Sequence, residues 1–167
     1  MRILVTGATS LIGSELASAL AARGDEVVTF QRHLSHGVRH PVTGSVDSPI
    51  TSRRGDVRDA EALLGAAVGC DAIVHLAAKV GVVGDWEEYR SINVDGTANV
   101  VAAARHAGID RVVHVSSPSV AHGGEPIVGA PADPPVLGRR HAFYAESKAI
   151  GENLALEAAG AELGVVA

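Results

Sequence analysis

The sequence is poor in the residues that several protein classes require. It has one cysteine, Cys70, which excludes an intramolecular disulfide and is typical of proteins in a reducing compartment. Its formal net charge of −5 argues against general binding to nucleic acids or acidic membranes, which needs a basic face. No apolar run is long enough to span a bilayer, and the run before Gly7 is too short for a signal-peptide core. These absences predict a soluble, cytoplasmic protein that binds neither nucleic acid nor membranes.

Aromatic residues are also scarce, at 3% of the chain. Apolar residues nevertheless make up 47% of it, so alanine, valine, leucine and glycine must build most of a sizeable core. The length of 167 residues fits one domain, which we expect to span residues 1–167.

Short β-branched runs alternate with segments of helical periodicity along the whole chain. The predicted strands are Arg2–Thr6, Glu26–Gln31, Arg53–Val57, Asp71–Ala77 and Asp110–Ser117, and a sixth starts at Gly164–Ala167. The predicted helices are Ser10–Ala22, Arg58–Val68, Trp86–Ala107 and Ala142–Glu162, and the predicted loops are Arg32–Ser52 and Ala121–Arg140. This order predicts an α/β fold, a doubly wound parallel sheet with helices on both faces.

The turn between the first strand and the first helix carries the strongest functional signal. Gly7 suits a tight turn, and Gly13 lets the helix pack close to the strand. The free amides and the positive dipole end at the start of the helix then face a pyrophosphate. Because a strand precedes this turn and a helix follows it, the turn predicts a dinucleotide site. The residues predicted to bind the cofactor here are Gly7, Thr9, Ser10, Leu11, Ile12 and Gly13.

The end of the second strand indicates which dinucleotide is bound. A site for NAD usually has an acid there, about 20 residues after the glycine turn, that bonds the ribose hydroxyls. Here the strand ends in Gln31 and Arg32, and the planar guanidinium of Arg32 can hold a 2′-phosphate. We therefore expect NADP to be preferred over NAD; the alternative is that Arg32 is a solvated loop residue.

Tyr144 and Lys148 lie four residues apart on a predicted helix and therefore share a face. A nearby ammonium favours the phenolate, so a tyrosine in this position can exchange a proton with a substrate alcohol or carbonyl. An isolated pair of this kind is more often an exposed helix face. The position of Tyr144 and Lys148 in the chain, rather than their spacing alone, therefore favours a catalytic role.

Six motifs in this order resemble the short-chain dehydrogenase/reductase superfamily, in its extended branch of nucleotide-sugar epimerases, dehydratases and 3β-hydroxysteroid dehydrogenases. The glycine-rich turn is followed by Gly55-Asp56-Val57, His75-Leu76-Ala77-Ala78, Asn93-Val94-Asp95-Gly96-Thr97, Ser116-Ser117 and the segment from Tyr144 to Lys148. The resemblance runs over the whole chain and implies a Rossmann fold that binds NAD(P).

The resemblance implies further cofactor-binding residues. Asp56 and Val57 would contact the adenine end, while Ala77 and Ala78, next to Leu76, would pass beside the nicotinamide ribose. Asn93 would brace the helix near the active site.

The resemblance also implies a catalytic group. Ser117 would orient the reacting oxygen, Tyr144 would be the acid/base, and Lys148 would hold the nicotinamide ribose and lower the pKa of the tyrosine. Ser119 is an alternative to Ser117, but Val120, three residues after Ser117, fits the spacing of the family.

Three departures from the family pattern affect these expectations. Ser10 replaces the middle glycine of the usual turn, where its hydroxyl could bond a phosphate, and Gln31 replaces the acid of NAD-dependent members. Extended members also continue through a sixth strand into a C-terminal substrate lobe, to which nothing in this sequence corresponds. We therefore expect a domain truncated at the start of the sixth strand, which binds cofactor, turns over no substrate and self-associates, for example as a homodimer.

Several other reactive residues are predicted to have no catalytic or metal-binding role. His33, His36 and His40 lie close together but lack carboxylate or thiol partners, so we predict solvated loop histidines and no metal site. His75 and His114 are expected to be hydrogen-bonded core residues, and Cys70 an inert thiol.

The leading hypothesis is an NAD(P)-dependent oxidoreductase, epimerase or dehydratase that begins with hydride transfer. Its small-molecule substrate would be a nucleotide sugar, a sterol or a small carbonyl or alcohol. The alternative is a non-enzymatic dinucleotide-binding module, such as a cofactor sensor or an assembly subunit. The presence of Ser117, Tyr144 and Lys148 favours the enzyme, because cofactor binding alone needs none of their chemistry.

Overall fold

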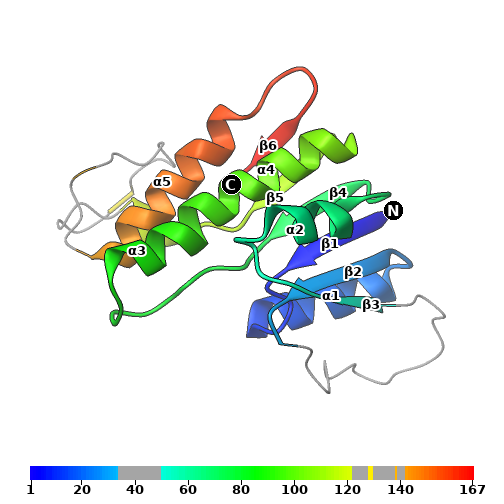
Figure 1. Cartoon of the computed structure of the whole chain (residues 1–167), viewed down its shortest axis with the longest axis horizontal. Coiled ribbons are helices and arrows are strands. Elements are labelled where there is room, and N and C mark those ends of the chain that lie inside the picture. Colours follow the sequence, from blue (N-terminus) through cyan, green and yellow to red (C-terminus); the bar gives the residue numbers. More distant parts are fainter. Residues whose placement is uncertain (34–49, 122–127, 130–137, 139–141) are drawn as a thin grey trace.

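The computed structural model describes residues 1–33, 50–121, 128–129, 138 and 142–167. Within this part of the chain, six parallel strands form one sheet in the order β3-β2-β1-β4-β5-β6 (Figure 1). The strands are β1 (Arg2–Thr6), β2 (Glu26–Gln31), β3 (Ile50–Arg54), β4 (Ala72–His75), β5 (Arg111–His114) and β6 (Gly164–Val166). The strand order reverses beside β1, as in doubly wound dinucleotide-binding folds, so the predicted fold class is confirmed.

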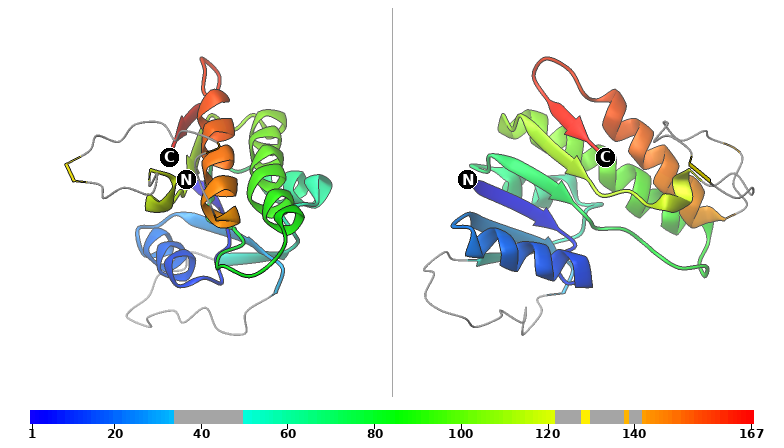
Figure 2. Two further views of the ribbon diagram at one scale, coloured as in Figure 1. Left: turned by 90° about the vertical axis from the view of Figure 1, so that its left-hand side faces the viewer. Right: turned by 180° about the vertical axis from the view of Figure 1, so that it is seen from behind.

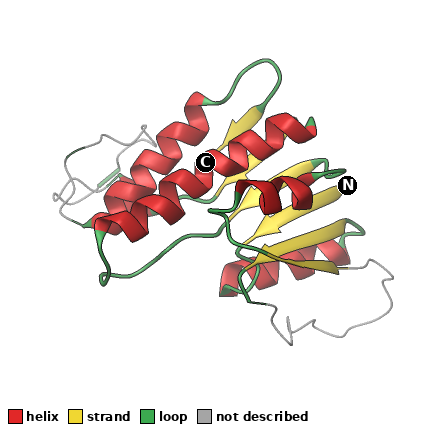
Figure 3. Cartoon of the chain, viewed as in Figure 1, coloured by secondary structure: helices red, strands yellow, loops and turns green. Residues whose placement is uncertain are grey.

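The helical elements cover both faces of the sheet (Figure 3). They are α1 (Leu11–Ala22), α2 (Ala60–Ala67), α3 (Trp86–Tyr89), the π-helix η1 (Arg90–Asp95), α4 (Gly96–Ala107), the 3-10 helix η2 (Pro118–Val120) and α5 (Phe143–Glu157). Figure 2 shows α1 on one face and α2, α4 and α5 on the other. None of the helices in the described ranges is long and apolar enough to cross a membrane.

Strand β1 divides the core into two layers because its side chains alternate between the faces of the sheet. Ile3 and Val5 pack with Ala17 and other residues on the α1 side. Leu4 packs on the opposite side, in a larger cluster that includes Leu63 of α2. Because both faces are covered, β1 is apolar almost throughout, as central parallel strands usually are.

The long helix predicted at Trp86–Ala107 is present, but it is not one regular α-helix. Its six middle residues form the π-helix η1, which contains the buried Asn93. The helix ends at Gly108, whose left-handed conformation, with φ of 70°, stops the chain from continuing as α-helix. Short π-helical segments within α-helices occur often at functional sites, and this one places the side chain of Asn93 in the interior.

Two predicted elements are corrected by the structure. The third strand is Ile50–Arg54, not Arg53–Val57, because it pairs with β2 in the register that sets Ile50 opposite Val27 and Arg53 opposite Phe30. The last helix ends at Glu157 rather than Glu162, because the chain turns after it and runs back to β6. The strands predicted at Arg2–Thr6 and Glu26–Gln31 and the bounds of the long helix are confirmed, and the remaining predicted elements overlap the observed ones and run one to three residues longer at their ends. Most of the two predicted loops lies outside the described residues.

The packing on the α2 face generates a stability prediction. Leu63→Ala should lower the free energy of unfolding by about 3 kcal/mol, because Leu63 is fully buried and its truncation leaves a cavity. The same change at the 81% exposed Leu11 should cost well under about 1 kcal/mol. Urea unfolding of both variants measures this difference, and equal losses would contradict the assignment of Leu63 to the core.

Candidate functional site

The chain leaves β1 through a turn that accepts only glycine. Gly7 has φ of 72°, in the left-handed region, and its amide donates to the Phe30 carbonyl at 3.1 Å. A Cβ atom at Gly7 would lie 2.7 Å from the amide nitrogen of Ala77. The turn after β1 therefore packs directly on the backbone that follows β4.

Ser10 closes this turn and begins α1. Its hydroxyl donates to the Gly7 carbonyl at 2.9 Å and accepts from the Gly13 amide at 3.0 Å. This is a helix cap, and it uses the hydroxyl that we considered as a phosphate ligand. Gly13 is buried, and a Cβ there would collide with the Gly7 carbonyl. The helix thus starts close against the strand, with its positive dipole end at the turn.

A cavity of about 230 Å³ opens at the carboxyl ends of β1, β2 and β4. Parallel α/β folds bind ligands at this edge, where the strand order reverses. Its lining contains the predicted residues Gly7, Thr9, Ser10, Gln31, Arg32, Asp56, Val57, Leu76, Ala77 and Ala78. Other predicted cofactor residues do not line it, namely Leu11, Ile12, Gly13, Asn93, Tyr144 and Lys148.

The sequence interpretation missed four residues of the lining: Phe30, His33, Gly55 and Ile92. Gly55 lies against the ring of Phe30, and a Cβ at this position would overlap that ring. Phe30 immediately precedes Gln31 at the end of β2, so its position was a signal for a place in the site. His33 is an exposed residue of the bend after β2, as predicted, and it also lies at the wall of the cavity.

The charged side chains near the end of β2 favour the binding of an anion in the cavity. Asp56 is held by Arg58 through two hydrogen bonds of 3.0 and 2.6 Å from its guanidinium, and this pairing lowers the pKa of the carboxyl. Arg32 and His33 line the same cavity. Gln31 is buried, and its Oε1 has no hydrogen-bond partner among the described residues.

A chain of buried hydrogen bonds runs inward from the glycine turn. The Thr6 hydroxyl accepts from the amides of Leu76 and Ala77, each at 3.2 Å, and lies 2.7 Å from His75 Nδ1. The Thr97 hydroxyl donates to the Asn93 carbonyl at 2.7 Å, so His75 Nε2, 3.2 Å away, is the donor to Thr97. Burial lowers the pKa of His75 well below its ordinary value, so the ring is neutral. The expected role of His75 as a hydrogen-bonded core residue is confirmed.

Asn93 joins the segment after β4 to α5. Its Oδ1 accepts from the Lys79 amide at 2.7 Å, and its Nδ2 donates to the Lys79 carbonyl at 3.0 Å and to Ser147 Oγ at 2.9 Å. Ser147 in turn donates to the Tyr144 carbonyl at 2.9 Å. Asn93 therefore braces the helix that carries Tyr144, which is the geometry that the sequence resemblance implied.

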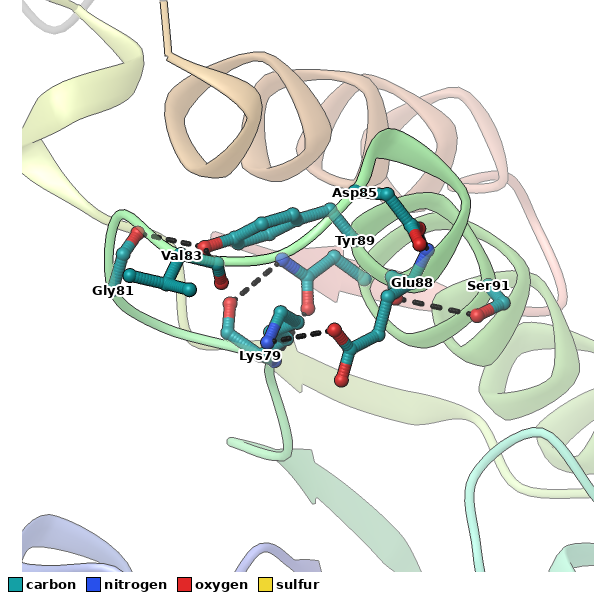
Figure 4. Close-up of polar contacts among 8 residues, drawn as sticks. Lys79, Gly81, Val83, Asp85, Glu88, Tyr89 and Ser91 are labelled. Atoms are coloured by element: carbon teal, nitrogen blue, oxygen red, sulfur yellow. Dashed lines mark hydrogen bonds and ion pairs between the residues drawn. The ribbon is translucent and has the colours of Figure 1, made fainter.

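The segment between β4 and α3 is fixed by side chains of α3, as Figure 4 shows. The Tyr89 hydroxyl donates toward the carbonyls of Gly81 and Val83, at 2.9 and 3.1 Å. Lys79 pairs with Glu88 at 2.9 Å, and its ammonium lies 5.1 Å from the centroid of the Tyr89 ring. These contacts hold in place the backbone that continues from Ala77 and Ala78 of the cavity.

Helix α5 sets Lys148 against the end of β5. The buried ammonium donates to the Val115 carbonyl at 2.7 Å and lies 3.4 Å from His114 Nε2. Burial lowers the pKa of Lys148 to about 8, and burial with the adjacent ammonium lowers the pKa of His114 to about 3. His114 Nδ1 has no partner in the described part of the chain, so only one of its ring nitrogens is hydrogen-bonded as expected.

The three predicted catalytic residues come from two neighbouring elements. Ser117 follows β5 and caps η2, with its hydroxyl 2.9 Å from that of Ser119. Tyr144 and Lys148 share a face of α5, and no hydrogen bond joins the Tyr144 hydroxyl to Lys148. Their catalytic roles remain a prediction.

Two further expectations concern other reactive groups. Cys70 is buried with its sulfur 3.6 Å from the Ala66 carbonyl, and burial raises the pKa of the thiol, as an inert cysteine requires. In the described ranges, no three His, Cys, Asp or Glu side chains come together as metal ligands. His36 and His40 lie outside these ranges.

The glycine turn generates a second prediction. Gly7→Ala should abolish dinucleotide binding and lower the free energy of unfolding by more than about 1 kcal/mol, since it forces φ of 72° on a residue with a Cβ. The control is Gly65→Ala, on a helix with nothing within 4 Å, which should raise stability by about 0.5–1 kcal/mol. Fluorescence titration with NADPH and urea unfolding test both variants. Unchanged binding by Gly7→Ala would contradict the location of the site.

Comparison with known proteins places this geometry in a family. A model of the NAD dependent epimerase/dehydratase family matches residues 3–167. The chain is 41% identical over 169 residues to a 2-alkyl-3-oxoalkanoate reductase of Stenotrophomonas maltophilia, covering 100% of this chain and 49% of that protein. It is 36% identical over 162 residues to a 3-beta-hydroxysteroid dehydrogenase of Mycolicibacterium neoaurum, covering 93% and 42%.

Solved structures show the same likeness. MoeE5 in complex with UDP-glucuronic acid and NAD superimposes with a TM-score of 0.82 at 32% identity, covering 99% of this chain and 52% of that one. The UDP-glucuronic acid 4-epimerase from Bacillus cereus in complex with NAD gives a TM-score of 0.78 at 27% identity, covering 99% and 55%.

The chain spans about half the length of the relatives it matches, and the matched half is their N-terminal, cofactor-binding part. With the family match over nearly its whole length, the chain belongs to the NAD-dependent epimerase/dehydratase family, the extended branch of the short-chain dehydrogenases/reductases.

Proposed function

We propose that this chain binds NADP(H) more tightly than NAD(H), with the guanidinium of Arg32 on the 2′-phosphate. The end of β2 carries this proposal, because Gln31 stands where an acid would bond the ribose hydroxyls of NAD. Arg32 and His33 line the cavity there, and the ionised carboxylate of Asp56 is already paired with Arg58. Two guanidinium groups and one carboxylate leave a net positive charge there, which favours a phosphate.

The residues of the cavity fit a dinucleotide. Gly7 allows the tight turn that packs on the backbone of Ala77, and α1 directs its N-terminus at this turn, where a pyrophosphate would bind. The solved relatives named above contain NAD, and the proposal for this chain differs in naming NADP(H) as the preferred cofactor.

We further propose that the whole protein is an oxidoreductase, epimerase or dehydratase acting on an alcohol or carbonyl carbon. The bound nicotinamide supplies or accepts the hydride. Tyr144 exchanges the proton with the substrate oxygen, Ser117 orients that oxygen, and Lys148 favours the phenolate and holds the nicotinamide ribose. The shared face of Tyr144 and Lys148 on α5, beside the end of β5, supports these roles.

The substrate is proposed only as a chemical class. The relatives include a reductase of alkyl oxoalkanoates, a hydroxysteroid dehydrogenase and proteins that bind nucleotide sugars. The reactive centre common to these molecules is a carbon bearing a hydroxyl or carbonyl oxygen, which is what Tyr144 and Ser117 would handle.

The cofactor preference is tested at Arg32. Arg32→Ala should weaken NADPH binding about tenfold or more, the scale of one charge-assisted contact, and leave NADH binding nearly unchanged. Arg53→Ala is the matched control, since this exposed β3 arginine does not line the cavity. Calorimetric titration measures both cofactors. Equal affinities of the native chain for NADPH and NADH, or no effect of Arg32→Ala, would refute the preference.

The proposed acid/base role of Tyr144 is tested in the whole protein, with a substrate that it turns over. Tyr144→Phe should lower kcat about 10²- to 10⁴-fold and leave cofactor affinity nearly intact, because only the proton-transfer group is lost. The control is the other tyrosine of the chain: Tyr89→Phe should lower thermal stability and change kcat far less. Hydroxysteroids, oxoalkanoates and nucleotide sugars form the substrate panel, followed by NADPH absorbance. A near-normal rate for Tyr144→Phe would assign proton transfer to another residue. Cofactor binding by the whole protein without turnover of any substrate would favour the binding-module hypothesis.

A further inference from the structure

Helix α5 buries a second charged side chain one turn beyond Lys148. Glu152 is 9% exposed, and its carboxylate accepts a hydrogen bond from the hydroxyl of Ser116. The residues Tyr144, Lys148 and Glu152 follow one another at intervals of four, so all three lie on the same face of α5. Neither the cofactor cavity nor the proposed proton transfer uses this carboxylate.

The two buried charged residues of α5 contact three consecutive residues at the end of β5. Lys148 contacts His114 and the Val115 carbonyl, and Glu152 holds Ser116. The next residue is Ser117, whose hydroxyl is proposed to orient the substrate oxygen. The position of Ser117 relative to Tyr144 therefore depends on both contacts from α5.

We propose that Glu152 is a positioning residue, which fixes the Ser116–Ser117 turn against α5 and supplies the negative charge that keeps the buried Lys148 ammonium protonated. The proposal rests on the roles proposed above for Lys148 and Ser117.

The electrostatic part follows from the burial of Lys148. Burial disfavours the ammonium and lowers the pKa of Lys148 to about 8, while the carboxylate of Glu152 acts in the opposite direction. A buried charge persists only when a nearby opposite charge or hydrogen bonds compensate for the loss of water. The Lys148 ammonium donates to the Val115 carbonyl and lies 3.4 Å from His114 Nε2, and both of these partners are neutral acceptors. Glu152, one turn further along the same face of α5, is the carboxylate that adds an opposite charge to these contacts.

The other titratable groups on the elements packed against α5 do not replace Glu152. His75 and His114 have lowered pKa values and are neutral near pH 7, and Tyr144 is the proposed acid/base. The charged side chains of α3, η1 and α4 have partners elsewhere: Arg90 pairs with Glu87 and Asp95, Glu88 with Lys79, and Arg105 with the Ala158 carbonyl. His106 of α4 is exposed, and its Nδ1 contacts the Ala102 carbonyl. On α5 itself, Glu146 bonds the Gly138 amide and Glu157 is exposed. Elements η2 and β6 contain no titratable side chain.

Removal of the Glu152 charge destabilises protonated Lys148 relative to the neutral amine, so the pKa of Lys148 falls. The ammonium would then be lost near neutral pH, together with its contribution to cofactor binding and to the phenolate of Tyr144. Removal of the Ser116 hydroxyl alone would free the turn and leave the charge of Lys148 in place.

The experiment measures the pKa of Lys148 in the free 167-residue chain, by pH titration of its side-chain NMR signals in protein labelled with ¹⁵N- and ¹³C-lysine. The sequence has two lysines, Lys79 and Lys148, so Lys148→Met assigns the spectrum and Lys79 serves as an internal reference.

Glu152→Gln keeps an acceptor for Ser116 but removes the charge, and it should lower the pKa of Lys148 by about one pH unit or more. Ser116→Ala should leave that pKa within about 0.3 of a pH unit of the native value. Glu152→Met removes the charge without adding an amide, and it takes the place of Glu152→Gln if that variant does not fold.

A second readout connects the charge to the site. NADPH affinity, followed by fluorescence across pH 6 to 9, should decline at a lower pH in Glu152→Gln than in the native chain, with the same affinity at the acidic end. An unchanged Lys148 pKa in both charge-removing variants overturns the inference, whether or not the cofactor binds. Absence of NADPH binding by the native chain overturns the proposed function instead, and the NMR titration still decides the role of Glu152.

Discussion

The cofactor cavity depends on the close approach of the chain after β1 to the chain after β4. A Cβ at Gly7 would lie 2.7 Å from the Ala77 amide, so a side chain at this one position would force the two segments apart. β1 lies between β2 and β4 in the sheet, and the N-terminus of α1 follows the same turn. Parallel strands end at a common edge, so this single contact brings Arg32, Asp56 and Ala78 to the wall of one cavity.

Buried polar groups at this edge connect the cavity to the helix that carries Tyr144. Thr6, His75, Thr97, Asn93 and Ser147 are joined from β1 to α5 by contacts of 2.7 to 3.2 Å. Each of these groups would be costly to bury without a partner, so the network fixes α5 relative to the glycine turn. Because the pKa of His75 is lowered well below its ordinary value, the network stays uncharged at neutral pH. The charges lie in the next layer, where Lys148 and Glu152 hold the end of β5.

The relatives of this chain have names that describe chemically different substrates, yet they share with it the half of their length that folds around the glycine turn. That shared half contains the cavity and the Tyr144 helix, so it supports a common cofactor and a common proton transfer better than any one substrate. The motif order from Gly7 to Lys148 was enough to predict the family and the fold, because four of the six motifs lie where a strand ends in a turn and the other two lie within helices. Such junctions depend on local backbone preferences that glycine, serine and β-branched residues reveal directly.

The sequence by itself determined the alternation of strands and helices, the dinucleotide turn and the face shared by Tyr144 and Lys148, because all three follow from spacing within a few residues. Only the tertiary structure decided where β3 begins, since the register of β2 selects Ile50–Arg54 over the more polar segment predicted from sequence. It also decided that His33 lines the cavity, that Asn93 lies in the π-helix η1, and that Glu152 accepts a hydrogen bond from Ser116. These features join residues that are distant in the sequence, and the packing of a sheet edge against helices, rather than any local preference, brings them together.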